Sequence, residues 1–174
     1  MFGGQGSMQM LGLSRALRDV QLILLCGHNQ ALAERMLAQR GNAPRAVLRF
    51  TSEVGRHMQA ADFFVGKPGP GCLSEAVQMG LPVITFENAW TMPQERFNVQ
   101  WVRETGVGLV LRSMRDIAPA AEGMIRRLPE FQASVRRVHN RAVFEVPEIL
   151  ARLLQAAARP TPFEAAACAP ATAA

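Results

Sequence analysis

A turn rich in glycine and proline constrains this chain more than any other feature. It lies within Phe64–Glu75, which reads FVGKPGPGCLSE. An apolar run that stops at such a turn and continues as a helical pattern indicates a β-strand followed by an α-helix. The first N–H groups of that helix have no partner within it, so an anion can bind there. Taken alone, the segment is more typical of a plain connection, in which Glu75 only complements the helix dipole.

Another glycine loop, at the start of the chain, changes this interpretation. Met1–Ser7 reads MFGGQGS and leads directly into the helical pattern of Met8–Arg18. Two glycine loops that each open a helix favour a shared phosphate site. In a βα unit such a loop follows a strand, yet only Met1 and Phe2 precede Gly3. We therefore expect the first strand to be largely missing and the chain to be the truncated C-terminal part of a longer protein.

Short apolar runs alternate with amphipathic segments along most of the chain. The runs predict strands at Val20–Cys26, Ala46–Phe50, Asp62–Val65, Leu81–Phe86 and Gly106–Leu111. The helical patterns that alternate with them fall in Leu32–Leu37, Glu53–Ala60, Cys72–Met79 and Gln94–Thr105. Strands that alternate with helices indicate βα units and a parallel sheet. The predicted fold class is α/β, with a Rossmann-like parallel sheet flanked by helices.

The last third of the chain is expected to be helical and then disordered. Helical patterns occupy Asp116–Arg127, Glu130–Ala142 and Pro147–Ala158. From Arg159 the composition shifts to Ala, Pro and Thr, which cannot form a core. A length of 174 residues suits one domain with its own core. We predict a single domain at residues 1–158 and a disordered tail at residues 159–174.

Composition excludes several classes of protein. The three cysteines, Cys26, Cys72 and Cys168, lack the spacing of a disulfide framework or a zinc site. No apolar run reaches the roughly 18 to 20 residues of a membrane span, and no signal peptide is recognisable. We expect a cytoplasmic location, with or without peripheral contact to the inner face of a membrane.

The formal charge of +5 is supplied almost entirely by arginine, and several arginines gather between Arg112 and Arg141. A solvated helical face is the commonest meaning of such a run. Contact with an anionic membrane surface is a second interpretation. Nucleic acid is not an expected partner, because interleaved aromatic residues and a recognised motif are absent from the sequence.

Five motifs occur in an order that resembles one enzyme family. They are FGGQGS at Phe2–Ser7, LCGHN at Leu25–Asn29, KPGPGCLSEA at Lys67–Ala76, GLPVI at Gly80–Ile84 and PQERFN at Pro93–Asn98. Together they resemble the C-terminal, donor-binding half of the glycosyltransferases related to bacterial MurG and to monogalactosyl and processive diacylglycerol glycosyltransferases. This is glycosyltransferase family 28, with the GT-B fold of two Rossmann-like domains that face each other across a cleft. The resemblance covers Phe2 to about Leu111.

The resemblance implies a UDP-sugar site and assigns its residues. The expected phosphate contacts are Gly3, Gly4, Gly6, Ser7, Gly69, Gly71, Cys72 and Leu73. Glu75 is expected at the ribose and Phe50 and Thr51 at the uracil. Gln94, Glu95 and Asn98 are expected at the sugar. Pro70 departs from the family pattern and cannot donate a hydrogen bond, which shifts phosphate contact onto Gly71 and Cys72.

The implied function is transfer of a glucosyl, galactosyl or N-acetylglucosaminyl group from a UDP-sugar to an acceptor such as a lipid. No cofactor or metal is required, since helix N-termini and loop amides can stabilise the departing UDP. The family's catalytic base lies in the N-terminal domain, so no catalytic residue is assigned to this chain. We expect the isolated chain to be inactive until an acceptor domain, or a separate chain, completes the cleft. A non-catalytic nucleotide-binding subunit and a relative of sugar-nucleotide epimerases are the alternatives. His28, at a strand end, is interpreted as a loop histidine.

Overall fold

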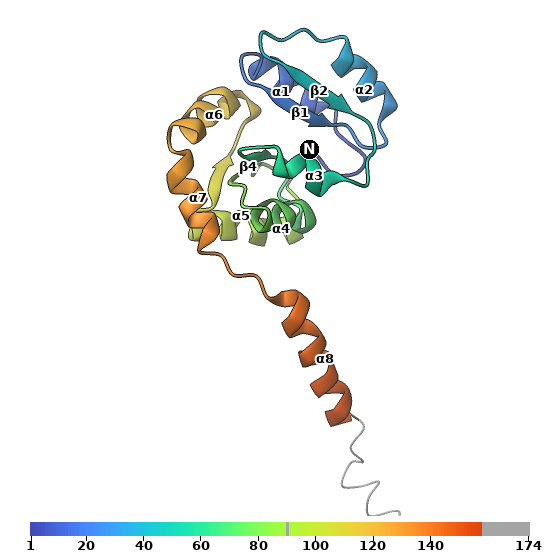
Figure 1. Ribbon diagram of the computed structural model, residues 1–174, viewed down its shortest axis with the longest axis vertical. Coiled ribbons are helices and arrows are strands. Elements are labelled where there is room, and N and C mark those ends of the chain that lie inside the picture. The colour runs from blue at the N-terminus through green and yellow to red at the C-terminus, as the bar shows by residue number, and fades with distance from the viewer. Residues whose placement is uncertain (90, 158–174) are drawn as a thin grey trace, which may run out of the picture. The chain divides into compact units, whose positions relative to one another are not determined.

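The computed structural model describes residues 1–89 and 91–157 (Figure 1). The chain divides into two compact units, Met1–Val138 and His139–Ala174. The first unit holds every predicted donor-binding residue. The predicted tail at residues 159–174 lies outside the described residues.

The strands of the first unit pair in parallel throughout the described residues. They are β1 (Leu22–Leu25), β2 (Arg45–Leu48), β3 (Phe64–Val65), β4 (Val83–Phe86) and β5 (Gly108–Leu111). They form two sheets, with the orders β1-β2 and β3-β4-β5. Helices follow the strands and cover the sheets (Figure 1). The predicted α/β class, with parallel strands flanked by helices, is therefore confirmed.

The helices lie close to their predicted positions. They are α1 (Gln9–Ala16), α2 (Gln30–Leu37), α3 (Val54–Gln59), α4 (Pro70–Gln78) and α5 (Pro93–Thr105). Helix α4 begins at Pro70 and not at Cys72, because proline has its φ angle preset for the first helical position and needs no N–H there. Glu75 consequently lies in the second turn of α4, beyond the first turn in which a carboxylate complements the helix dipole.

Two clusters of buried side chains lie on opposite faces of the sheets. Ile84 of β4 belongs to the first cluster, with residues of α1 and α2 such as Met10 and Leu32. Val83, its neighbour in β4, belongs to the second cluster, with residues of α4 and α5. Successive side chains of a strand point to opposite faces, so β4 is buried on both sides. This double burial explains why its sequence is apolar without alternation.

The start of the chain lies between two strands, β1 and β3, that belong to different sheets. Met1 lies between them, and its amino nitrogen donates a hydrogen bond to the carbonyl oxygen of Val65 at 2.8 Å. Phe2 is buried and its ring stacks on that of Phe86 in β4, with 6.0 Å between ring centroids. The chain therefore enters the fold through the interval between the two sheets.

The helices after β5 differ in part from the prediction. A short 3₁₀ turn, η1 (Met114–Asp116), precedes α6 (Ile117–Arg126) and α7 (Leu128–Arg136). Helix α8 (Ala142–Ala157) was predicted to begin only at Pro147, and α7 was predicted to run on to Ala142. The side-chain oxygen of Asn140 accepts a hydrogen bond from the N–H of Ala142, which caps α8 ahead of the proline. Both predicted boundaries are therefore wrong.

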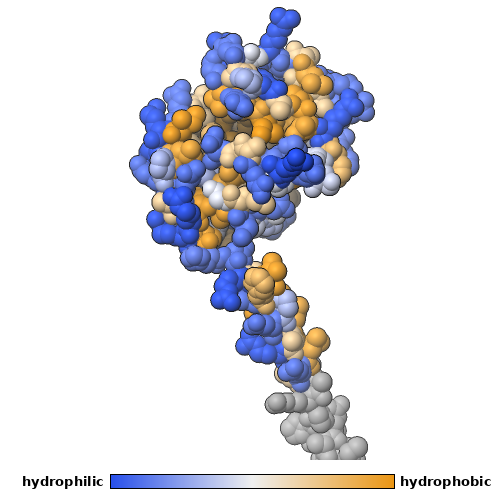
Figure 2. Space-filling view, viewed as in Figure 1, coloured by the Kyte–Doolittle hydropathy of each residue, from blue (hydrophilic) through white to orange (hydrophobic). Residues whose placement is uncertain are grey.

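Helix α8, in the second unit, is amphipathic. Hydrophobic residues lie along one side of it and hydrophilic residues along the other (Figure 2). Val146, Leu150, Leu153 and Leu154 belong to the hydrophobic side, and Glu145, Glu148 and Arg152 to the hydrophilic side. Within residues 1–89 and 91–157, no helix combines the length and the apolar character that crossing a membrane would require.

Candidate functional site

The predicted donor-binding segments follow the carboxyl ends of parallel strands. Phe50 and Thr51 follow β2, Gly69 follows β3, and the Met1–Ser7 loop begins between β1 and β3. Parallel strands place all their carboxyl ends at one edge of a sheet, where ligands bind in open α/β folds. Because the strands are parallel, these segments lie at the same edge of the first unit.

The first glycine loop, Met1–Ser7, is fixed to the end of β1 by its backbone. The N–H of His28 donates to the carbonyl of Gly4 at 2.9 Å, and the N–H of Gly6 donates to the carbonyl of Gly3 at 3.1 Å. Gly6 has a φ of +62°, and a Cβ added there would overlap the carbonyl oxygen of Cys26. Only glycine fits at this position, for both conformation and space.

The remainder of the first loop is open. A Cβ added at Gly3 or Gly4 would meet nothing within 4 Å. The hydroxyl oxygen of Ser7 accepts a hydrogen bond from the N–H of Gln9 at 3.3 Å, at the beginning of α1. The part of this loop that a ligand could approach is therefore Gly3–Gly4, whereas Gly6 serves packing and Ser7 has a local partner.

The second loop, Gly66–Gly69, is held by β4 and α5. The hydroxyl of Thr85 donates to the carbonyl of Gly66 at 3.0 Å, and both groups are buried. The side-chain amide of Asn98 donates to the carbonyl of Pro68 at 2.8 Å. Side chains from two other elements thus fix the path of the loop up to the start of α4.

The start of α4 offers two donors. Gly69 is the N-cap and Pro70, which has no N–H, is the first helical residue. The N–H of Leu73 donates to the carbonyl of Gly69 at 3.2 Å, so it is engaged within the helix. The N–H groups of Gly71 and Cys72 remain, and a Cβ added at Gly71 would meet nothing within 4 Å. An anion at this terminus would bind Gly71 and Cys72 but not Leu73.

Neither Cys26 nor Cys72 is activated as a nucleophile. Burial, and then the negative charge of Glu75, raise the pKa of the Cys72 thiol above its ordinary value. Burial also raises the pKa of the Cys26 thiol. Both cysteines therefore stay protonated at neutral pH, and a thiol is a weak nucleophile. Among residues 1–89 and 91–157, no three metal-binding side chains gather into a site.

His28, which the sequence presents as a loop histidine, is a neighbour of the predicted uracil contacts. The rings of His28 and Phe50 stack with 4.0 Å between their centroids and an interplanar angle of 17°. The hydroxyl oxygen of Thr51 accepts a hydrogen bond from the N–H of Glu53 at 3.0 Å. His28 and Phe50 follow different strands, so only the pairing of β1 with β2 brings their rings together. No local sequence signal could have shown this stack.

The predicted sugar contacts lie in the first turns of α5. Asn98 is engaged with the second loop, and an oxygen of Glu95 lies 3.9 Å from the point that a Cβ of Gly69 would occupy. The side-chain amide of Gln94 contacts the sulfur of Met92 at 3.3 Å. The structure therefore brings Glu95 and Asn98 to the second loop, while Gln94 points to a residue before α5. Phe97, in the same helix, is 73% exposed.

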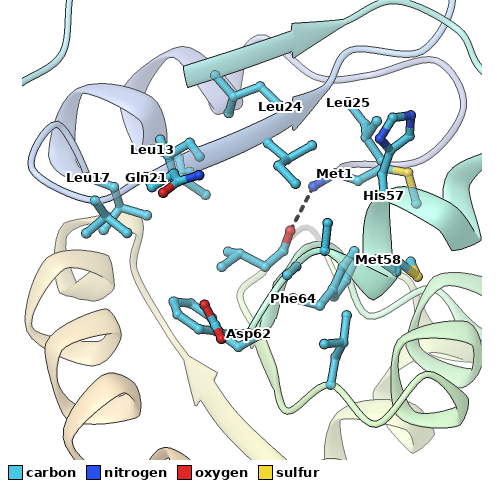
Figure 3. Close-up of a pocket in the computed structure, with 18 of the residues that line it drawn as sticks. Met1, Leu13, Leu17, Gln21, Leu24, Leu25, His57, Met58, Asp62 and Phe64 are labelled. Atoms are coloured by element: carbon cyan, nitrogen blue, oxygen red, sulfur yellow. Dashed lines mark hydrogen bonds between the residues drawn. The ribbon is translucent and has the colours of Figure 1, made fainter. Parts of the chain in front are cut away.

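A cavity of about 500 Å³ lies elsewhere, between β1 and β3 (Figure 3). None of the predicted donor-binding residues lines it. Figure 3 shows Leu24 and Leu25 of β1 on one side, Phe64 of β3 on the other, and Met1 between them. The cavity is therefore separate from the glycine-loop site.

Comparison with curated proteins identifies long relatives. The chain is 33% identical over 129 residues to monogalactosyldiacylglycerol synthase, chloroplastic, from Spinacia oleracea, a match that covers 68% of this chain and 24% of the relative. It is 31% identical over 171 residues to a probable monogalactosyldiacylglycerol synthase, chloroplastic, from Glycine max, covering 89% of this chain and 32% of the relative. The chain thus spans about a quarter to a third of the length of these relatives.

Comparison with solved structures identifies a shared fold. MurG from Acinetobacter baumannii superposes with a TM-score of 0.70 at 16% identity, over 86% of this chain and 48% of that chain. The glycosyltransferase SnogD from Streptomyces nogalater superposes with a TM-score of 0.55 at 17% identity, over 90% of this chain and 42% of that chain. The fold is that of one half of a GT-B glycosyltransferase. Residues 8–115 also match the family described as Glycosyltransferase family 28 C-terminal domain, and the chain therefore belongs to this family.

Proposed function

We propose that this chain is the donor-binding part of a glycosyltransferase that uses a UDP-sugar. The transferred group is a hexosyl group, either glucosyl, galactosyl or N-acetylglucosaminyl, and the acceptor is a lipid hydroxyl. Membership of the family 28 C-terminal domains carries this proposal. The two glycine loops support it, because each leads into a helix whose first N–H groups can bind an anion.

The diphosphate of the donor binds between the two loops. The N–H groups of Gly71 and Cys72 face it from the start of α4, and the backbone of Gly3 and Gly4 approaches from the first loop. Glycine allows close approach because it has no Cβ. These dipoles stabilise the negative charge that develops on UDP as the bond to the sugar breaks.

The ribose, the uracil and the sugar of the donor bind to residues outside the two glycine loops. The carboxylate of Glu75 accepts hydrogen bonds from the ribose hydroxyls. The side chain is exposed on α4, so a ligand can reach it. The uracil binds near Phe50 and Thr51, beside the ring of His28. Glu95 and Asn98, in the first turns of α5, bind the sugar hydroxyls together with Gln94.

The acceptor half of the enzyme is supplied from outside this chain. It comprises an N-terminal domain of the same polypeptide, or a separate chain, and it carries the base that deprotonates the acceptor hydroxyl. The isolated chain is therefore inactive. The exposed arginines Arg136 and Arg137 of the α7 region favour peripheral contact with an anionic membrane surface, which suits a lipid acceptor. Such an enzyme acts at the cytoplasmic face of the membrane.

Calorimetric titration of the chain with UDP, UDP-glucose, UDP-galactose and UDP-N-acetylglucosamine tests the proposal. We expect all four to bind through the shared UDP group. Glu75→Ala should weaken each by roughly 1 to 3 kcal/mol, or about 5- to 150-fold, because it removes a charged acceptor of two hydroxyls. Comparison of UDP with 2′-deoxy-UDP should then show a smaller difference in the variant than in the parent chain.

Glu122→Ala is the matched control, since it removes an exposed carboxylate from α6, which carries no predicted donor contact. Its affinity for UDP should equal that of the parent chain. Equal affinity of the Glu75 variant and the parent would disprove the ribose assignment. Absence of binding for all four nucleotides would contradict the donor-binding role itself.

A further inference from the structure

The rings of His28 and Phe50 form a stacked pair at the surface of the first unit. Their centroids lie 4.0 Å apart and their planes are inclined by 17°, which is face-to-face contact. Both residues are exposed, and Phe50 has 58% of its surface accessible. Because the pair is exposed, it contributes little to the hydrophobic core of the fold.

Strand pairing places the two rings next to each other. Strands β1 and β2 lie side by side and run parallel (Figure 1). The N–H of Cys26 donates to the carbonyl of Leu48 at 2.8 Å, and His28 and Phe50 each follow two residues later. Parallel strands bring their carboxyl ends to the edge of the sheet where ligands bind. The stacked pair therefore lies at the edge that carries the proposed uracil contacts.

The main chain of His28 contacts the first glycine loop. Its N–H donates to the carbonyl of Gly4 at 2.9 Å. Gly27, directly before it, has a φ of +62°, and a Cβ added there would overlap the same carbonyl oxygen. Residue 28 thus contacts the proposed phosphate part of the site through its main chain and the proposed uracil part through its ring. Every residue except proline keeps the N–H, so substitution of the side chain separates the two contacts.

The ring of Phe50 has one covered face and one open face. His28 covers the first at stacking distance, and the exposed fraction of 58% leaves the opposite face accessible. Nucleobases stack on aromatic faces of this kind. The open face is next in sequence to Thr51, the other proposed uracil contact, so it is placed to receive the base of a nucleotide.

The histidine ring limits the freedom of the phenylalanine ring before a ligand binds. The main chain around Phe50 is held by β2 on one side and, on the other, by the bond from the N–H of Glu53 to the hydroxyl of Thr51 at 3.0 Å. The remaining freedom is rotation of the ring about its side-chain bonds. A ligand that has to order such a side chain loses about 2- to 12-fold in affinity. Stacking on His28 orders Phe50 in the free protein and avoids this loss.

We propose that His28 is a positioning residue of the donor site, whose ring holds Phe50 in the orientation on which the nucleobase of the UDP-sugar stacks. The base lies on the face of Phe50 opposite His28, so that imidazole, phenyl ring and uracil form one stack. The side chain of His28 thereby serves binding of the base and not of the phosphates. This inference rests on the proposed function, because it requires a nucleotide in this site.

Calorimetric titration of the 174-residue chain with UDP provides the first test. His28→Ala should weaken UDP binding by about 2- to 12-fold, because Phe50 is then ordered only by the ligand. His28→Phe keeps a ring against Phe50 and should restore most of the affinity. His139→Ala is the matched control, since it removes an exposed histidine of the second unit, and it should bind UDP like the parent chain. A His28→Phe chain as weak as His28→Ala would overturn the proposal.

A double-mutant cycle provides the second test. Phe50→Ala removes the stacking face and should weaken UDP binding by roughly 5- to 150-fold. Because His28 acts through Phe50, the double variant should bind UDP as Phe50→Ala alone does. A further loss in the double variant would show that His28 supports the loop or contacts the nucleotide itself, and would overturn the proposal.

The outcomes separate this inference from the donor-binding role. If the parent chain binds UDP and His28→Ala binds it equally well, the role of His28 is wrong while the donor-binding role stands. If the parent chain does not bind UDP, both are wrong.

Discussion

The two glycine loops of the first unit resemble each other in sequence but differ in what their glycines do. In the first loop, Gly6 has a positive φ and lies so close to the Cys26 carbonyl that no side chain fits. Just after the second loop, in the first turn of α4, a Cβ added to Gly71 would meet nothing within 4 Å. One glycine is required for packing, whereas the other leaves room for a ligand. Glycine in a loop is therefore not by itself a sign of ligand contact.

Gly6→Ala should produce the largest change in stability. A left-handed conformation costs an alanine about 1 to 2 kcal/mol, and displacement of the Cys26 carbonyl adds to this. We expect a loss of roughly 3 kcal/mol in the free energy of unfolding, measured by urea denaturation followed by circular dichroism. Gly4→Ala, with open space and no positive φ, should change it by less than about 0.5 kcal/mol. Similar losses in the two variants would refute the contrast within the first loop.

The buried amino group that begins the first loop should make stability depend on pH. Burial lowers the pKa of the Met1 ammonium from 8.0 to about 6. Between these values the unfolded chain binds more protons than the folded chain, so stability rises as pH increases from 6 to 8 and the contribution is complete above 8. The expected gain is on the order of 2 kcal/mol.

Acetylation of the amino group gives the control for this effect. An acetylated chain has no ammonium at Met1, so its stability should vary much less between pH 6 and 8. The histidines are the same in both forms, so their contribution to the pH dependence of stability cancels when the two profiles are compared. Parallel pH profiles for the two forms would show that the amino group is hydrated and not buried.

Gly71→Ala should have the smallest effect on stability and a distinct effect on binding. Alanine replaces glycine inside α4 without a contact within 4 Å, which should raise stability by up to about 1 kcal/mol. The added methyl group lies beside the proposed phosphates, so the affinity for UDP should fall several-fold in calorimetry. Ser74→Ala, at an exposed position of the same helix, should leave UDP affinity unchanged. A Gly71 variant with full affinity would place the phosphates away from α4.

Much of the fold could be predicted because its signals are local. The apolar runs of β1 and β4, bounded by turns, are recognisable from a few neighbouring residues. The start of α8 was missed because a cap at Asn140 outweighs the usual meaning of Pro147 as a first helical residue. Phe97 and Trp101 are four residues apart, a spacing that favours one buried helix face, yet Trp101 packs against the core and Phe97 is exposed.

The candidate site was harder to predict than the fold. Its segments could be recognised by resemblance, yet their partners depend on tertiary contacts. His28 stacks on Phe50 because β1 pairs with β2, and this contact has no signature in the local sequence. The bond from Leu73 to Gly69 is local, but it depends on α4 beginning at Pro70 and not at Cys72.

The hydrogen bonds that Thr85 and Asn98 make to the second loop have a consequence for the thermodynamics of binding. They fix the backbone from Gly66 to Pro68 while no ligand is present. A ligand that meets this loop therefore loses little conformational entropy to ordering it, and more of the contact energy appears as affinity. The backbone of the second loop is therefore pre-organised before a ligand binds, by the buried hydroxyl of Thr85 and the half-buried amide of Asn98.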